Sequence, residues 1–329
     1  MKIPWRGLIA LALTVGLLWW AFKDVDWTEL WHHARAADPF LTILAVALGT
    51  SCFALRAFRW RPILDPVAPN LPYGALWRAT AIGFMANNLL PTGRAGEIVR
   101  PYMLSRETGV PFSAGFASLV VDRVFDALTV ILLIAVALLD PSRPAGFSAG
   151  MFATTTVMIV LALGAGLYAI VFFPDSLIRL FEAFARRVAP RFEERGRAML
   201  RAFADGLSVL RHPRRFIVIF AWALAHWLVQ PLAFWVGFIA LGIDVPFTAA
   251  LFVQGIIVFA VVVPSTPGFF GPFEAAAKVA LGLYGIDENH ALAWSLTYHI
   301  LSLIPITLIG LYYLARSGLH LGELKQIKS

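Results

Sequence analysis

The sequence predicts an all-helical membrane protein that crosses the bilayer several times. Of its 329 residues, 59% are hydrophobic and only 14% are charged, and the mean hydropathy is +0.75. A soluble domain is about half apolar and about a quarter charged. Several apolar runs are also long enough to cross a bilayer core of about 30 Å. The composition is therefore that of a polytopic membrane protein.

The charge and cysteine content exclude several functional classes. A formal net charge of +7 would suit nucleic acid, but the arginines lie between apolar segments, as they do in cytoplasmic loops of membrane proteins. We therefore expect no nucleic-acid partner. Cys52 is the one cysteine, so an intrachain disulfide and a cysteine-based metal site are both excluded. Nothing in the sequence predicts a metal or a cofactor.

The first apolar segment has the basic start and apolar centre of a signal peptide. It lacks a small-residue cleavage site, because Trp19, Trp20 and Phe22 occupy that position. We expect an uncleaved first span instead.

Six long apolar segments predict membrane spans, and two further apolar segments are interrupted. The six segments cover residues 5–22, 39–58, 112–139, 151–173, 216–241 and 290–315. The interrupted segments, residues 75–104 and 247–284, contain PTGRAG and PSTPGFFGP. Proline and glycine disfavour a continuous helix there. The predicted break residues are Pro91, Gly93, Gly96, Pro264, Pro267, Gly268 and Gly271.

Loop charges predict the direction of each span. With Lys2 and Arg6 in the cytoplasm, the acidic loop 23–38 lies outside. The arginine-rich linker 174–215 then lies inside only if segment 75–104 enters and leaves by one face. We therefore predict re-entrant hairpins, cytoplasmic amino and carboxyl termini, and a bacterial inner-membrane location.

Two parts of the chain share one order of elements: a long span, a broken hairpin and a long span. Their hairpins would enter from opposite faces, as in the inverted repeats of transporters. Two independently kinked helical segments are the alternative interpretation. The single membrane domain, residues 1–329, would comprise a first span with outer loop (1–38), repeat 1 (39–139, hairpin 75–104), a fourth span (140–173), a basic amphipathic cytoplasmic linker (174–215), repeat 2 (216–316, hairpin 247–284) and a cytoplasmic tail (317–329).

The first break predicts a polar cavity, because non-helical backbone and charged side chains are costly in hydrocarbon. Arg94, Glu97 and Arg100 recur every three residues. The free N–H groups of a helix start favour an anion, and guanidinium groups strengthen that preference. At a membrane, the available phosphate is a lipid headgroup. The alternative is that these arginines lie at the interface and pair nonspecifically.

The third span carries Asp122, Arg123 and Asp126 about 15 Å deep, at 1.5 Å per residue. At that depth the charges must face the bundle interior, and we expect Arg123 or one aspartate to pair with the first hairpin. A purely structural ion pair is the alternative.

Near the second break, Glu274 and Lys278 have the spacing of an intrahelical ion pair. His299 is a further buried candidate, either as a proton relay or as a packing residue. The complete set of predicted substrate-binding residues is Asn88, Arg94, Glu97, Arg100, Asp122, Arg123, Asp126, Glu274, Lys278 and His299.

No motif of a hydrolase, metalloprotease, nucleotide-binding loop or dinucleotide-binding fold occurs in the sequence. We therefore predict no catalytic residues and expect that the protein is not an enzyme.

Three motifs in order resemble a known family. They are N-x-x-P-x-x-R-x-G-E-x-x-R from Asn88 to Arg100, an acidic-Arg-x-x-Asp element from Asp122, and P-x-x-P-G-x-x-G-x-x-E ending at Glu274. Together they resemble the lysylphosphatidylglycerol synthase transmembrane-region family, also called flippase-like domain proteins. The family often has glutamate at the position of Asp122 and a basic residue at the position of Phe273.

The resemblance implies a multi-pass inner-membrane protein that moves lipids between leaflets. In fused members a soluble aminoacyltransferase domain makes the lysyl lipid. That domain is absent here, so we expect no synthase activity. The predicted function is a flippase or transporter of a phosphate-bearing amino- or glycolipid, with membrane lipids as partners. The alternatives are a non-transporting partner of a glycosyltransferase or lipid-synthesis enzyme, an intramembrane lipid-modifying enzyme, and a small-solute carrier.

Overall fold

The computed structural model is helical throughout the part of the chain that it describes, with no strand there. It describes residues 5–90, 94–142, 154, 158, 172–188, 193–194, 197, 201, 212–262, 267–319 and 323. The helices are α1 (Trp5–Phe22), α2 (Trp27–Ala36), α3 (Pro39–Leu64), α4 (Tyr73–Leu89), α5 (Gly96–Thr108), α6 (Phe112–Leu139), α8 (Pro174–Val188), α10 (Pro213–Ala240), α11 (Phe247–Ala260), the 3₁₀ turn η3 (Pro267–Phe269), α12 (Pro272–Gly282) and α13 (Glu288–Arg316).

Three described helices, α3, α10 and α13, are long and apolar enough to cross a membrane. Helix α6 has 28 residues but carries three charges in its middle. The all-helical membrane fold predicted from composition is confirmed. Six spans remain a prediction, because the fourth predicted span, residues 151–173, lies almost entirely outside the described residues.

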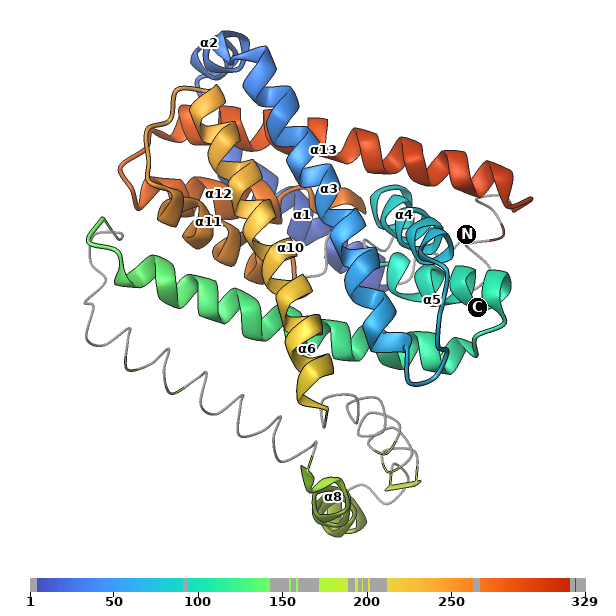
Figure 1. Cartoon of the computed structure of the whole chain (residues 1–329). Coiled ribbons are helices and arrows are strands. Elements are labelled where there is room, and N and C mark those ends of the chain that lie inside the picture. Colours follow the sequence, from blue (N-terminus) through green and yellow to red (C-terminus); the bar gives the residue numbers. More distant parts are fainter. Residues whose placement is uncertain are drawn as a thin grey trace.

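Helices α3 and α10 run side by side across the molecule, and α13 crosses them (Figure 1). Aromatic side chains fill the junction between α10 and α13. The Phe238 and Trp294 ring centroids are 4.5 Å apart, and those of Phe234 and Tyr298 are 5.1 Å apart. All four side chains are buried. Burial of such large rings supplies much of the packing energy of a helical bundle.

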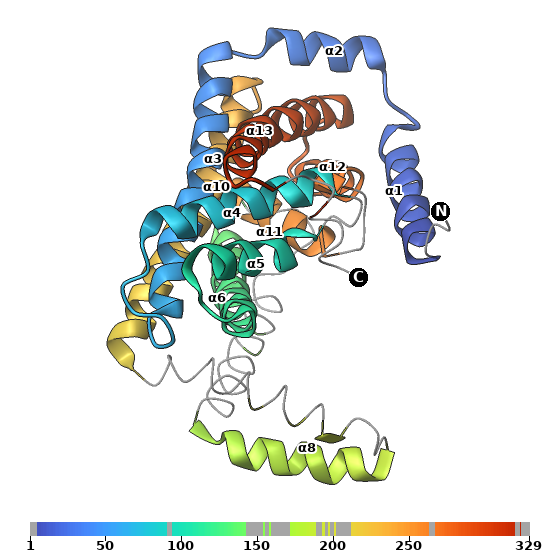
Figure 2. The same cartoon turned by 90° about the vertical axis from the view of Figure 1, so that its right-hand side faces the viewer.

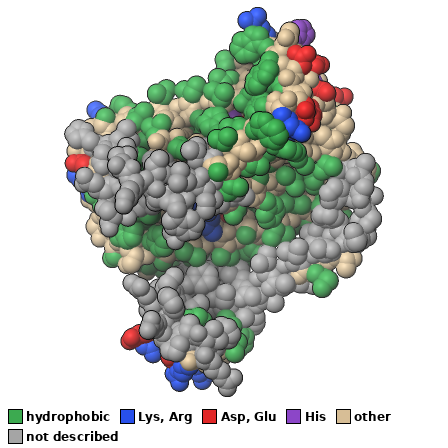
Figure 3. Space-filling view, turned by 180° about the vertical axis from the view of Figure 1, so that it is seen from behind, with side chains coloured by type: hydrophobic (Ala, Val, Ile, Leu, Met, Phe, Trp, Pro, Cys, Tyr) green, Lys and Arg blue, Asp and Glu red, His purple; other side chains and the backbone are tan. Residues whose placement is uncertain are grey.

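Helices α2 and α8 lie across opposite ends of the bundle (Figure 2). Asp26 caps the start of α2 by accepting hydrogen bonds from the backbone N–H groups of Thr28 and Glu29. Asn289 at the start of α13 donates to Glu29 over 2.6 Å, which holds α2 on α13. On the face seen in Figure 3, charged side chains gather over α2 and over α8, with apolar side chains between them. This distribution suits a bundle with a membrane around its middle.

The first interrupted segment is an antiparallel helical hairpin. Gly83 of α4 lies against Gly96 of α5, and further along Arg78 of α4 is bound to Glu107 of α5. Asn87 accepts a hydrogen bond of 2.7 Å from the backbone N–H of Gly96, which satisfies one free donor at the start of α5. The interruption predicted within 75–104 is confirmed. Two of its predicted residues, Pro91 and Gly93, lie outside the described residues.

The second interrupted segment consists of α11, η3 and α12. Gly268 and Gly271 have φ of 73° and 93°, in the left-handed region where glycine carries no Cβ penalty. Phe269 between them has φ 62°, which is unusual for a bulky side chain. The interruption predicted within 247–284 is confirmed, with η3 starting at Pro267. Pro264 lies outside the described residues.

The close contact of the two glycines in the first hairpin predicts the effect of Gly96→Ala. A Cβ at residue 96 would overlap the Gly83 carbonyl and lie 2.8 Å from the Asn87 Oδ1 atom. We expect the free energy of unfolding to fall by about 1–3 kcal/mol, the usual cost of overpacking. Gly282→Ala is the control, because nothing lies within 4 Å of an added Cβ there. Thermal unfolding of the purified protein measures both, and equal melting temperatures would contradict this packing.

Candidate functional site

A cluster of buried ions joins α3 to α6. Asp122 and Asp126 lie one turn apart on α6, and Arg56 and Arg59 lie on α3. Arg59 is within 2.5 Å of Asp122 and 2.8 Å of Asp126, while Arg56 is paired with Asp126. Each of these four residues is less than 10% exposed. Charges at this depth are tolerated only when they are paired and hydrogen-bonded.

Helices α5 and α10 complete the cluster. Arg100 of α5 lies 3.5 Å from Asp122, and its guanidinium group stacks on the Trp60 ring at 3.9 Å. Trp60 in turn donates a hydrogen bond of 2.7 Å to Ser118 of α6. Trp227 of α10 donates a hydrogen bond of 2.7 Å to Asp126. The aspartates of α6 are therefore the common partner of three neighbouring helices.

The buried cluster carries more positive than negative charge. Three buried guanidinium groups, those of Arg56, Arg59 and Arg100, face two buried carboxylates. Five buried nitrogen atoms of these arginines have no hydrogen-bond partner, among them Nε and Nη2 of Arg100 and Nε of Arg56. Native structures leave few buried polar atoms unpaired, so each such atom needs an explanation. An anion that accepts from these donors would supply both the charge and the hydrogen bonds.

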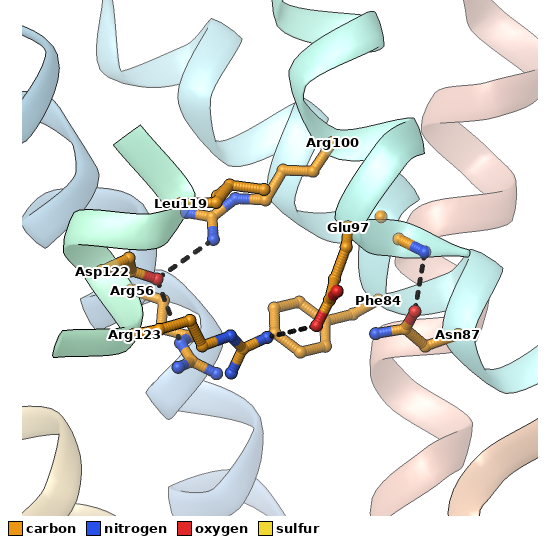
Figure 4. Close-up of a pocket in the computed structure, with 10 residues that line it drawn as sticks. Arg56, Phe84, Asn87, Glu97, Arg100, Leu119, Asp122 and Arg123 are labelled. Carbon is orange, nitrogen blue, oxygen red and sulfur yellow. Dashed lines mark hydrogen bonds and ion pairs between the residues drawn. The ribbon is translucent and has the colours of Figure 1, made fainter. Parts of the chain in front are cut away.

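A second group of charges forms the rim of the cluster. Glu97 of α5 lies 3.2 Å from Arg123 of α6 and 4.0 Å from Arg94. The exposed fractions of these side chains are 37% for Glu97, 45% for Arg94 and 56% for Arg123. Figure 4 shows Arg123 and Glu97 reaching toward each other across a cavity, with Arg100 on its other side. The contact that the sequence predicts between the third span and the first hairpin is present.

The rim separates a small polar cavity from a larger apolar groove. The polar cavity is small, about 20 Å³, and is lined by Arg56, Asn87, Glu97, Arg100, Asp122 and Arg123, among others. The groove is larger, about 370 Å³, and runs between apolar side chains of α6 and α11. Arg56, Phe84, Asn87, Glu97 and Arg123 line both spaces. The polar cavity therefore opens directly onto the apolar groove.

The two breaks touch each other at this groove. Arg94, beside the first break, donates to the backbone carbonyl of Val262 over 3.1 Å and of Val261 over 3.3 Å. Both carbonyls follow the end of α11, where the second break begins. The hydrogen bonds satisfy carbonyl groups that a helix end leaves without an intrahelical partner.

Glu274 and His299 form a separate buried pair at the second break. His299 Nδ1 lies 2.6 Å from Glu274 Oε1, and its Nε2 lies 2.8 Å from the Gly268 carbonyl. The sequence expectation of an ion pair between Glu274 and Lys278 is wrong. Lys278 instead lies 2.7 Å from Glu288 of α13, because tertiary partners lie closer to both side chains than they do to each other. Neither Glu274 nor Lys278 lines the two cavities described above.

Asn88 does not reach the polar cavity. It donates to Thr307 of α13 over 2.9 Å, and the preceding Asn87 lines the cavity instead. Adjacent residues on a helix point about 100° apart, so the motif position identified the turn but not the face. The sequence also did not identify Arg56, Arg59, Trp60 and Trp227 as members of the cluster. It indicated only that arginines lie near the end of a predicted span. In the described part of the chain, no group of three His, Cys, Asp or Glu is placed to hold a metal.

The shared role of Asp126 predicts the effect of removing its charge. In Asp126→Asn the guanidinium groups of Arg56 and Arg59 lose a carboxylate, and we expect a loss of about 3–5 kcal/mol of stability. Glu107→Gln is the matched control, because its pair with Arg78 lies partly exposed at the surface and surface pairs contribute about 0–1 kcal/mol. Thermal unfolding compares the two, and an equal loss in both variants would refute the central role of Asp126.

Comparison with known proteins places this site in a family context. Residues 7–310 match the family described as the lysylphosphatidylglycerol synthase TM region. A UPF0104 membrane protein of Methanothermobacter thermautotrophicus is 26% identical over 86% of this chain and 85% of its own length. Another from the same organism is 23% identical over 97% of both chains. Glycosyltransferase AglD of Haloferax volcanii is 27% identical over 92% of this chain and 52% of its own length.

The family match covers nearly the whole chain, including both breaks and the charged helix α6. The resemblance predicted from the three motifs is thus confirmed, and with it a helical membrane protein. This chain belongs to the lysylphosphatidylglycerol synthase transmembrane-region family.

Proposed function

We propose that this protein binds a phosphate-bearing lipid and moves it between the two leaflets of the membrane. The observation that carries the proposal is the uncompensated buried guanidinium charge, with its unpaired N–H groups, beside a polar cavity. Phosphate oxygens accept several charge-assisted hydrogen bonds, and arginine is well suited to bind them. The phosphate would bind against Arg100, Arg56 and Arg123, and the polar cavity between them would widen to admit it.

The apolar groove favours a lipid over a soluble anion. Its walls include Val130 and Ile131 of α6 and Val258 and Phe259 of α11. A soluble phosphate compound would gain nothing from such walls, whereas a hydrocarbon chain gains about 25 cal/mol for each square ångström removed from water. The groove and the polar cavity meet at the rim, so one amphipathic molecule can occupy both.

The proposal includes the inverted arrangement of six spans and two re-entrant hairpins. The antiparallel first hairpin and the contact between the two breaks support it. We further propose that residues 174–215 and both termini are cytoplasmic, with the chain in the inner membrane of the cell. The excess of arginine in that linker favours this orientation. Alternating movement of the hairpins would then expose the headgroup site to each leaflet in turn.

Lipid movement in reconstituted vesicles tests the proposal. Vesicles that contain the protein would carry a phospholipid with a fluorescent label on its acyl chain. An impermeant quencher is added outside, and the rate at which the label in the inner leaflet loses its fluorescence reports exchange between leaflets. Arg123→Gln removes a cation from the shared rim, and a lost hydrogen bond to a charged group costs about 1.5–3 kcal/mol. We therefore expect exchange at limiting lipid concentration to fall about 10- to 150-fold.

Arg61→Gln is the matched control, because Arg61 is exposed in the last turn of α3, outside both cavities. It should exchange phospholipid at the wild-type rate. A labelled diacylglycerol, which lacks phosphate, should cross no faster with protein than without it. Wild-type exchange in Arg123→Gln, or equal protein-dependent movement of both lipids, would overturn the proposal.

The likeness to glycosyltransferase AglD favours a second candidate function, that of a non-transporting membrane partner of a glycosyltransferase. Helix α8, with Arg179 and Arg186 exposed, is the surface we propose for that contact. Crosslinking in native membranes followed by mass spectrometry should then recover a glycosyltransferase with the wild type. Recovery should be lost when Arg179 and Arg186 are replaced by glutamate and retained in Arg61→Glu. Recovery that is unchanged in the α8 variant would exclude this contact.

A further inference from the structure

The Glu274–His299 pair holds together the backbone of the second break. Glu274 Oε2 accepts a hydrogen bond of 2.7 Å from the Gly271 N–H, and Oε1 faces His299 Nδ1. His299 Nε2 faces the carbonyl of Gly268. This chain of contacts ties η3 and the start of α12 to α13. It spans the segment in which Gly268, Phe269 and Gly271 all have positive φ.

The hydrogen-bond partners fix how many protons the pair holds. The Gly268 carbonyl can only accept, so His299 Nε2 must carry a proton and donate it. His299 Nδ1 and Glu274 Oε1 are 2.6 Å apart, so a second proton must lie between them. The pair is therefore neutral overall, either as imidazolium with carboxylate or as imidazole with carboxylic acid. Loss of the shared proton would leave two lone pairs facing each other and one buried negative charge.

The surroundings isolate this proton. Glu274 is 0% and His299 is 5% exposed, and the Phe273 ring stacks on the imidazole at 4.1 Å. The nearest lysine in the sequence, Lys278 of α12, does not pair with Glu274. It binds Glu288 of α13 and the Ala21 carbonyl of α1 instead.

The other nearby polar groups are also occupied by other contacts or are neutral. Arg94 of the first hairpin binds the carbonyls that follow α11. The Tyr298 hydroxyl of α13 accepts from Gln230 of α10, and Gln254 of α11 is neutral. Among the described residues, none of these groups forms an ion pair with Glu274, so loss of the shared proton would leave the carboxylate charge without a neutralising partner.

We propose that Glu274 and His299 form a proton-binding site that couples movement of the second hairpin to proton transfer. With the shared proton bound, the break is fastened to α13. When that proton leaves to water, the Glu274 carboxylate carries an uncompensated charge, the contact with His299 breaks, and η3 and α12 are released. The inference rests on the proposed lipid movement for its biological role, since it gives that movement a source of energy.

Glu274→Gln tests the coupling with little change of shape. The amide oxygen can accept from the Gly271 N–H and the amide nitrogen can donate to His299 Nδ1, so the variant reproduces the protonated pair permanently. In vesicles with a pH difference across the membrane, the wild type should move protons with phospholipid and respond to the direction of the difference. The variant should lose both effects while still retaining bound phospholipid. Glu107→Gln, an acid-to-amide change outside the pair, should behave as wild type.

A second measurement separates this inference from the lipid proposal. As pH rises, the melting temperature of the purified wild type should fall where the pair loses its proton, and Glu274→Gln should lack that fall. Lipid movement without proton movement, equal in the wild type and the variant, would overturn the coupling and leave the lipid function standing. Should no lipid move at all, the lipid proposal fails, and melting curves with the same pH dependence in both proteins would overturn the proton site as well.

Discussion

The structure depends on the pairing of two buried carboxylates in the middle of α6. Asp122 and Asp126 are paired with arginines of α3 and α5, and this pairing holds α6 against the adjacent α5 and against α3, which lies much earlier in the chain. Ions buried in a low-dielectric interior cost several kcal/mol each unless their partners are close and correctly oriented. A purely structural pair would need only matching charges. This cluster contains an additional guanidinium group and unpaired donors.

The two broken hairpins add to this cluster at two separate points. The first brings Glu97 and Arg100 to the polar cavity, and Arg94 connects it to the end of α11. The second break is closed by Glu274 and His299 without contributing either to the polar cavity. The proposed anion site and the contact that closes the second break are thus in different places. Arg94 and the groove beside it connect the two. This separation is what coupling between two events requires.

Hydrophobic length and proline–glycine breaks predicted the helices well, because both effects are local in sequence. The sequence also predicted that α6 meets the first hairpin, since deep charges need partners. It did not identify Arg56 and Arg59 as those partners, because arginines near the end of a span are equally typical of a membrane interface. It placed Asn88 rather than Asn87 in the site, since a motif does not define which helix face is buried. The partner of Glu274 depended on α13, which no local spacing could indicate.

The lipid retained by the purified protein tests the central claim most directly. Native mass spectrometry of the wild type, released gently from membranes, should detect a bound phosphate-bearing lipid. The same measurement on Arg100→Gln should show that lipid lost, because the neutral side chain removes the excess cation beside the cavity. A wild type that retains no lipid, or a variant that retains the same lipid to the same extent, would contradict an anion site built from these arginines.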